Sequence, residues 1–183
     1  MKYLTEILEE LNQLDETPRL EAKACQDAVG KSFYETVCAF SNEPGLGGGI
    51  IVLGVSSAEE DLFGAYEVTG VSDTDKILSD IASGCSTIFN CRIRPQTEVV
   101  ERDGKAVIIV EIPEASAANK PVFQKSQGLP KGARRRIGST DQRCDEDDLQ
   151  VLFTERGGES YDLTPIPTAS LLDFDEDAIA HYR

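Results

Sequence analysis

The sequence is poor in the residues that metal centres and histidine-dependent catalysts use. It has one histidine, His181, and five cysteines, none of them spaced as Cys-x-x-Cys. A structural zinc site needs four clustered ligands, and a Ser-His-Asp triad would have only His181 to draw on, so both classes of site are poorly supplied. The odd number of cysteines in a chain of 183 residues predicts reduced, mostly buried thiols rather than a disulfide framework.

Long apolar runs are missing too. No stretch approaches the roughly 18 apolar residues of a membrane-spanning helix, and the N-terminus lacks the apolar segment and cleavage site of a secretory signal. We therefore expect a cytoplasmic protein with no membrane partner. Apolar residues make up 40% of the chain and charged residues 28%, which is enough for a packed core and excludes a wholly disordered chain.

Positive charge is scarce but concentrated. The formal net charge is -15, which by itself disfavours nucleic acid, because phosphate binding relies on lysine and arginine. Residues 120–143, however, carry seven of the 18 basic residues and one acid, Asp141. A basic segment therefore lies within an otherwise acidic chain and is a candidate for phosphate binding.

Hydrophobic periodicity predicts an α+β fold. Apolar residues at helical spacing predict helices over residues 3–14, 31–41, 73–89 and 145–156. Strands are expected over residues 20–24, 47–55, 66–71, 97–101, 105–112, 122–124 and 134–137. The run from Gly47 to Val55 is typical of a buried central strand, and Asp103-Gly104 predicts a β-hairpin. We expect a mixed sheet packed against several helices.

The chain is expected to divide near Gly158. Residues 1–158 contain all the periodic segments and should form one domain. The composition then changes, with two prolines in residues 161–167, and we expect residues 159–183 to form a linker and the start of a following domain.

Three glycines, Gly47, Gly48 and Gly49, form a phosphate-loop candidate. A dinucleotide-binding loop places its glycines after a strand and before a helix, whereas these follow a helix and precede a strand. The Gly-Lys-Ser/Thr of a Walker A loop is absent. A turn that needs positive φ is the favoured interpretation, and a backbone-amide contact to phosphate stays open.

Glu16, Glu21 and Lys23 form a second candidate site. Residues 21 and 23 would share one face of a strand. Carboxylates beside a lysine can hold Mg²⁺ or Mn²⁺ and position a phosphodiester, and these would be the catalytic residues of a nuclease. The alternative is a surface ion pair with solvated acids. No other cofactor is indicated.

The basic segment supplies the third candidate site. Its cationic and hydroxyl side chains can bind phosphates, and the expected nucleic-acid contacts are Lys131, Arg134, Arg136, Ser139, Thr140 and Arg143. If residues 134–137 form a strand, Arg135 points away from its two neighbours. Alternatively, these arginines pair with the abundant acids of the same chain.

Several short motifs occur in the order found in a known family. The sequence resembles Schlafen-type AlbA-like domains over roughly residues 5–163. The matching segments are residues 20–23 (LEAK), 36–42 (TVCAFSN), 47–55 (GGGIIVLGV), 120–123 (KPVF) and 136–140 (RIGST). The resemblance implies an α+β module assigned to DNA binding, which in bacterial relatives precedes winged-helix or ATPase-like segments of transcriptional regulators and ATP-binding proteins.

The resemblance also implies an enzymatic alternative. Some Schlafen-type members are endoribonucleases with a carboxylate triad, of which two members would map onto Glu16 and Glu21. The third is an aspartate directly after the I-G-V motif, where this chain has Ser56 and Ser57. Acids from residues 59–61 could substitute. Because hard cations depend on the number of oxygen ligands, this departure favours binding over cleavage.

The favoured hypothesis is a nucleic-acid-binding module of a bacterial transcriptional regulator, with DNA preferred over RNA. A metal-dependent endoribonuclease with a degenerate triad is the first alternative, and an oligomerisation scaffold is the second. A homodimer would fit any of the three.

Overall fold

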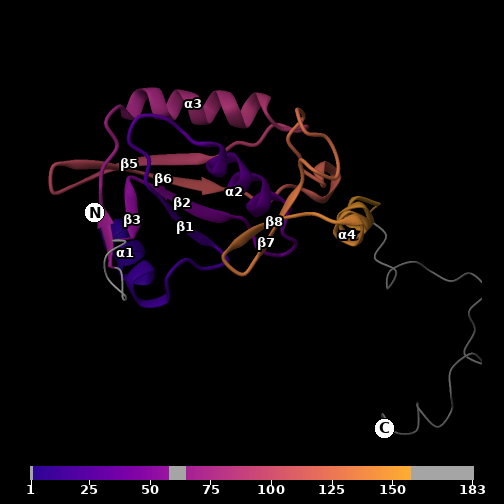
Figure 1. The fold of residues 1–183 in the computed structure, drawn as a ribbon, viewed down its shortest axis with the longest axis horizontal. Helices are drawn as coiled ribbons and strands as arrows, with labels where there is room; N and C mark the ends of the chain where they lie inside the picture. Colours follow the sequence, from indigo (N-terminus) through magenta and orange to yellow (C-terminus); the bar gives the residue numbers. More distant parts are fainter. Residues whose placement is uncertain (1, 58–64, 158–183) are drawn as a thin grey trace, which may run out of the picture.

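The computed structural model describes residues 2–57 and 65–157, and it has the expected α+β architecture (Figure 1). The first helix, α1 (Lys2–Leu14), buries its apolar stripe and ends where Asp15 adopts a φ of 62°. Burying each such side chain contributes about 1.5–3 kcal/mol. The stripe consists of Leu4, Ile7, Leu8 and Leu11.

A four-stranded mixed sheet forms the centre of the domain, in the order β1-β2-β6-β5. Strand β1 is parallel to β2, and the other two pairings are antiparallel. The strands are β1 (Leu20–Lys23), β2 (Gly49–Leu53), β6 (Lys105–Ile112) and β5 (Gln96–Arg102). The predicted β5–β6 hairpin is confirmed: Asp103 and Gly104 have φ of 52° and 73°, as a type I′ turn requires.

Helices cover both faces of this sheet. Helices α2 (Lys31–Asn42) and α3 (Thr74–Thr87) pack on one face, over a core that includes Phe33, Phe40 and Ile51. Helix α1 packs on the other face, and Figure 1 shows α3 and α1 on opposite sides of the sheet. Buried residues on both faces explain why β2 reads as a continuous apolar run.

The predicted strand over residues 47–55 is broken at Gly54, which has a φ of 86°. The chain turns there into β3 (Val55–Ser57), which pairs with β4 (Tyr66–Val68) in a separate two-stranded sheet. The prediction of one strand through Val55 was therefore wrong at its end, because the backbone conformation of one glycine redirects the chain.

The C-terminal part forms a second unit on α2. Strands β7 (Arg134–Ile137) and β8 (Thr140–Arg143) make a hairpin, and α4 (Glu146–Gly157) follows it. A short 3-10 helix, η1 (Ala117–Asn119), precedes the hairpin. Strand β8 was not predicted. The strand expected over residues 122–124 is only two isolated bridges, Phe123 to Ala133 and Gln124 to Phe89.

The cysteines are all free, as predicted, and four of the five are buried. Within the described residues, no helix is both long enough and apolar enough to cross a membrane. The expected linker and following segment, residues 159–183, lie outside the described residues, as do the three acids at residues 59–61.

Candidate functional site

The guanidinium of Arg136 is the centre of the candidate site. Its Nη2 lies 2.7 Å from Glu21 Oε2 and donates to the Thr17 carbonyl at 3.0 Å, while Nη1 donates to Asp141 Oδ1 at 2.8 Å. The carbon Cζ lies 4.9 Å from the centroid of the Phe40 ring, a cation–π contact. The side chain is fully buried. A charge buried in this way persists only when it is paired, so Arg136 ties β7 to β1, β8 and α2.

The residues of the predicted carboxylate site lie close together, with Glu21 and Lys23 on β1 and Glu16 just before it. Lys23 Nζ lies 2.6 Å from Glu21 Oε1, and Glu16 Oε1 accepts a hydrogen bond from the Ala22 amide at 3.1 Å. Burial, and next the negative charge of Glu21, raise the pKa of Glu16. Glu21 therefore receives a cation on each side, Lys23 at Oε1 and Arg136 at Oε2, although the N–H of Arg136 is not aligned for a hydrogen bond.

The carboxylates do not form a metal-binding group in the described part of the chain. No three aspartate, glutamate, cysteine or histidine side chains converge there in a way that could hold an ion. Arg136 instead lies between Glu21 and Asp141 and forms an ion pair with each. Sequence reasoning missed the role of Asp141. The available signal was its place opposite Arg136 in the β7–β8 hairpin, where opposite charges attract across the strands.

The position of the family's third carboxylate is held by Ser56 on β3, opposite Glu67 on β4. Residues directly opposite in an antiparallel pair have Cβ atoms roughly 4.5–5.5 Å apart. Glu67 is therefore an acidic neighbour of Ser56 across the two strands. Nearby, Tyr66 donates a short hydrogen bond to Asp15. Burial, and next this bond to Asp15, raise the pKa of Tyr66.

The three consecutive arginines are all paired with acids of the same chain. Arg134 Nη2 lies 2.5 Å from Glu35 Oε1 on α2. Arg135 points to the other side of the strand, as predicted, and binds both oxygens of Glu43, with Nε at 3.0 Å and Nη2 at 2.8 Å. Arg134 and Arg136 are each less than one tenth exposed. The alternative of internal ion pairs is therefore what the structure shows, and a phosphate contact from Arg134 or Arg136 would have to break these pairs.

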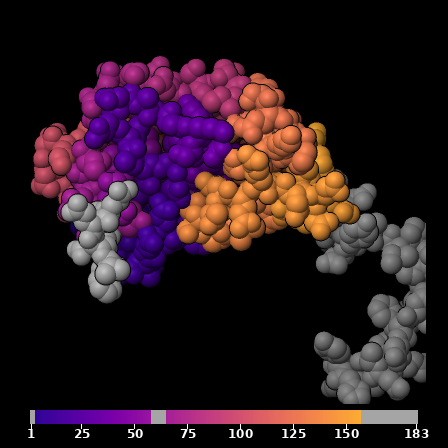
Figure 2. Space-filling model, in the orientation of Figure 1, coloured from indigo at the N-terminus to yellow at the C-terminus, as the bar shows by residue number. Residues whose placement is uncertain are grey.

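The other four predicted nucleic-acid contacts are exposed. Lys131 precedes β7, Ser139 and Thr140 lie at the hairpin turn, and Arg143 ends β8. Within residues 2–57 and 65–157, no acid forms an ion pair with Lys131 or Arg143. Figure 2 shows the hairpin, in orange, on the surface next to the sheet domain. The structure thus separates the predicted contacts into two buried arginines and four exposed residues.

The glycine loop already binds an anion, which is a carboxylate of the same chain. Glu114 accepts hydrogen bonds from the amides of Gly45 at 3.1 Å and Gly47 at 2.7 Å. It also pairs with Lys120 Nζ at 2.7 Å, and this buried amine contacts Glu155 on α4 at 2.9 Å. Burial by itself would raise the pKa of Glu114, but Lys120 and the two amides lower it. Glu114 was not singled out from the sequence, and Lys120 was noted only as the first residue of the basic segment and of the KPVF motif.

Gly48 and Gly49 are required by packing. A Cβ on Gly48, which has a φ of 89°, would lie 2.0 Å from the carbonyl oxygen of Ile112, and one on Gly49 would lie 2.6 Å from the Phe40 ring. The favoured interpretation of the loop as a turn that needs positive φ is confirmed at Gly45, Gly47 and Gly48.

Comparisons with known proteins give a family and a fold. The N-terminal domain of a RecG-related protein from Nitrosomonas europaea, a proposed ATP-dependent DNA helicase, is 45% identical, with a TM-score of 0.61 over 77% of this chain and 92% of that chain. The DIP2311 protein of Corynebacterium diphtheriae, at 18% identity and a TM-score of 0.53, shares the fold; the match covers 98% of this chain and 36% of that one. No curated protein matches. The family described as Schlafen, AlbA_2 matches residues 16–145, and the chain therefore belongs to the Schlafen AlbA_2 family.

Proposed function

We propose that this domain binds nucleic acid, DNA in preference to RNA, through the exposed side of the β7–β8 hairpin. The observation that carries the proposal is the separation of charges in the basic segment. Lys131 and Arg143 have no acid partner among the described residues, while the neighbouring arginines are held in ion pairs beneath them. Cations free of internal partners can exchange their counterions for phosphates, which is the main source of affinity for DNA.

The buried arginines support this surface rather than contact the ligand. Arg134 and Arg136 anchor β7 on α2 and β1, so the hairpin is fixed before a ligand arrives. Fixed side chains lose less conformational freedom on binding. The hydroxyls of Ser139 and Thr140 at the turn add donors for phosphate oxygens. Contacts of this kind position a duplex without reading its sequence.

The relatives support the same kind of role. The Nitrosomonas europaea domain, with 45% identity, belongs to a proposed DNA helicase, and the family resemblance implies bacterial regulators. On this basis we propose that the domain is part of a cytoplasmic transcriptional regulator. ATP binding by the glycine loop is not favoured, because Glu114 already accepts hydrogen bonds from the amides of Gly45 and Gly47. Homodimerisation stays a prediction, which light scattering coupled to size exclusion would measure.

Fluorescence anisotropy with labelled duplex DNA, single-stranded DNA and structured RNA tests the proposal. The double variant Lys131→Gln/Arg143→Gln should weaken binding of duplex DNA by about tenfold, since each phosphate contact of this type contributes roughly 0.5–1 kcal/mol or more. Lys76→Gln at the start of α3 is the matched control, because it removes an exposed lysine whose amine meets only a backbone carbonyl. Equal affinities for the wild type and the double variant would contradict the proposed interface.

A second candidate function, a metal-dependent endoribonuclease, is favoured by one observation: Glu16, just before β1, lies beside Glu21 and Lys23 on that strand. Cleavage of structured RNA that requires Mg²⁺ or Mn²⁺ and is lost in Glu16→Gln would establish this activity. Glu16 is the better position to change, because Glu21 also pairs with Arg136. We expect no metal-dependent cleavage, since Arg136 fills the space between Glu21 and Asp141.

A further inference from the structure

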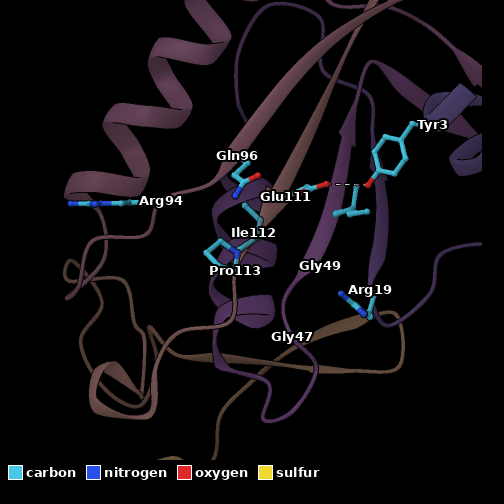
Figure 3. Close-up of a pocket in the computed structure, with 10 residues that line it drawn as sticks. Tyr3, Arg19, Gly47, Gly49, Arg94, Gln96, Glu111, Ile112 and Pro113 are labelled. Atoms are coloured by element: carbon cyan, nitrogen blue, oxygen red, sulfur yellow. Dashed lines mark hydrogen bonds between the residues drawn. The ribbon is translucent and has the colours of Figure 1, made fainter. Parts of the chain in front are cut away.

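A pocket lies on the α1 side of the sheet, beside the glycine loop, and its lining includes no residue of the β7–β8 hairpin (Figure 3). Its volume is about 370 Å³. Ligand pockets in proteins span roughly 300–1,000 Å³, so this one suits a ligand the size of a single nucleotide. It is lined by Tyr3, Arg19, Gly47, Gly49, Ile50, Arg94, Gln96, Glu111, Ile112 and Pro113.

Two arginines on opposite sides of the pocket are available to an anion. Figure 3 shows Arg19 and Arg94 flanking the pocket, with Glu111 between them. Both are exposed, and no acid in the described residues forms an ion pair with either. The Nη2 of Arg19 lies 3.8 Å from where a Cβ of Gly47 would stand. The guanidinium therefore lies beside the glycine loop, where it can donate to a phosphate group.

The middle of the pocket offers hydrogen-bonding groups and flat surfaces. Gln96 and Glu111 are direct cross-strand partners at the edge of the sheet. Glu111 Oε1 accepts from the Tyr3 hydroxyl at 3.1 Å, and Oε2 has no protein partner in the described part of the chain. Tyr3 keeps 38% of its surface exposed, so its ring can stack on a base. Ile50 and Pro113 add apolar contacts beside these polar groups.

From this arrangement we propose that the pocket binds a phosphorylated nucleoside, with the phosphate on Arg19. Glu111 and Gln96 then receive the hydroxyl or amino groups of the nucleoside, and Arg94 closes the opposite side. A simple dianion would leave the acceptor oxygen of Glu111 facing negative charge, which disfavours it. The ligand is either a free mononucleotide or the 5′-phosphorylated end of a strand, which share this chemistry. The inference is independent of the hairpin interface.

Isothermal titration with adenosine 5′-monophosphate tests the site, using the full chain. We expect saturable binding that Arg19→Gln weakens by about tenfold and Arg94→Gln by about threefold, in line with the loss of charge-assisted hydrogen bonds. Arg156→Gln, which removes an exposed arginine on α4, and Lys131→Gln/Arg143→Gln should both leave this affinity unchanged. That second control separates the pocket from the hairpin.

Comparison ligands settle which chemistry is recognised. Adenosine and inorganic phosphate should each bind at least about tenfold more weakly than the monophosphate, because each keeps only part of the contacts. A 5′-phosphorylated dinucleotide that binds more tightly than the monophosphate would identify a strand end as the source, and weaker binding would identify a free nucleotide. Absence of saturable binding, succinate bound as tightly as the monophosphate, or unchanged affinity in Arg19→Gln would overturn the proposal.

Discussion

Replacing Arg136 should lower the free energy of unfolding of the domain, because this side chain anchors the β7–β8 hairpin to β1 and α2. Arg136→Ala would leave Glu21 and Asp141 facing one another without the cation that now contacts both at 2.7 and 2.8 Å. Removing one partner of a buried ion pair costs about 3–5 kcal/mol, because the remaining charge stays buried and unpaired. The lost contact with the Phe40 ring adds to this. A loss of at least about 3 kcal/mol is therefore expected.

Urea denaturation followed by circular dichroism measures this loss directly. Arg143→Ala is the matched control, since Arg143 ends the partner strand but is exposed; surface changes of this kind fall within about 0.5 kcal/mol. A double-mutant cycle with Arg136→Gln and Glu21→Gln isolates their pairing, which should amount to about 1–3 kcal/mol. If Arg136→Ala lowered the free energy of unfolding by less than about 1 kcal/mol, the central role of this residue in the fold would be refuted.

Three further predictions follow from other contacts. Gly48→Ala should destabilise the domain more than Gly45→Ala, because a Cβ at Gly48 would lie 2.0 Å from the Ile112 carbonyl oxygen, whereas no atom lies within 4 Å of a Cβ at Gly45. Gly45→Ala should cost only about 1–2 kcal/mol, and equal urea midpoints for the two variants would contradict this difference. Lys120→Met should cost about 3 kcal/mol, since Glu114 and Glu155 lose their shared cation; an unchanged thermal midpoint would show that this cation is dispensable. The pKa of Glu114 is lowered in the folded state, so this carboxyl stabilises the fold above its unfolded-state pKa, and the stability is lost as pH falls through its folded-state pKa. The pKa of Glu16 is raised, so this carboxyl contributes stability at low pH, which is lost as pH rises through its folded-state pKa. Glu114→Gln should therefore lose stability near pH 7, whereas Glu16→Gln should gain stability near pH 7, because it removes a carboxylate charge that burial and Glu21 penalise, and should change little near pH 4. Denaturation at both pH values measures this, and a loss of stability near pH 7 in Glu16→Gln would refute the assigned shift.

Local patterns were sufficient for most of the secondary structure. The apolar stripe of α1, the buried run of β2 and the Asp103-Gly104 turn each depend on neighbours in sequence, and each was predicted correctly. The break at Gly54 was missed because a glycine inside a strand run is compatible with continuing it; only the pairing of β3 with β4 decides the matter. Strand β8 was missed because its sequence, Thr-Asp-Gln-Arg, has no apolar alternation.

The site was harder to predict because its contacts join distant segments. Glu35 on α2 pairs with Arg134, and Glu43 at the C-terminal cap of this helix pairs with Arg135. These partners are about a hundred residues apart in the sequence, and no spacing rule connects them. The sequence indicated that the arginines could contact either phosphates or acids of the same chain. The alternation of side chains along a strand predicted only that Arg135 points to the opposite face from Arg134 and Arg136. That Glu114 fills the glycine loop likewise has no local signal.

The salt dependence of duplex DNA binding, measured by anisotropy for the wild type and for Lys131→Gln/Arg143→Gln, tests the hairpin interface most directly. We expect log K to fall linearly with log salt concentration, with a slope that is shallower by about 2 in the double variant, since each lost phosphate contact removes about one unit. Binding that ignores salt, or identical slopes in the two proteins, would contradict a nucleic-acid interface on the β7–β8 hairpin.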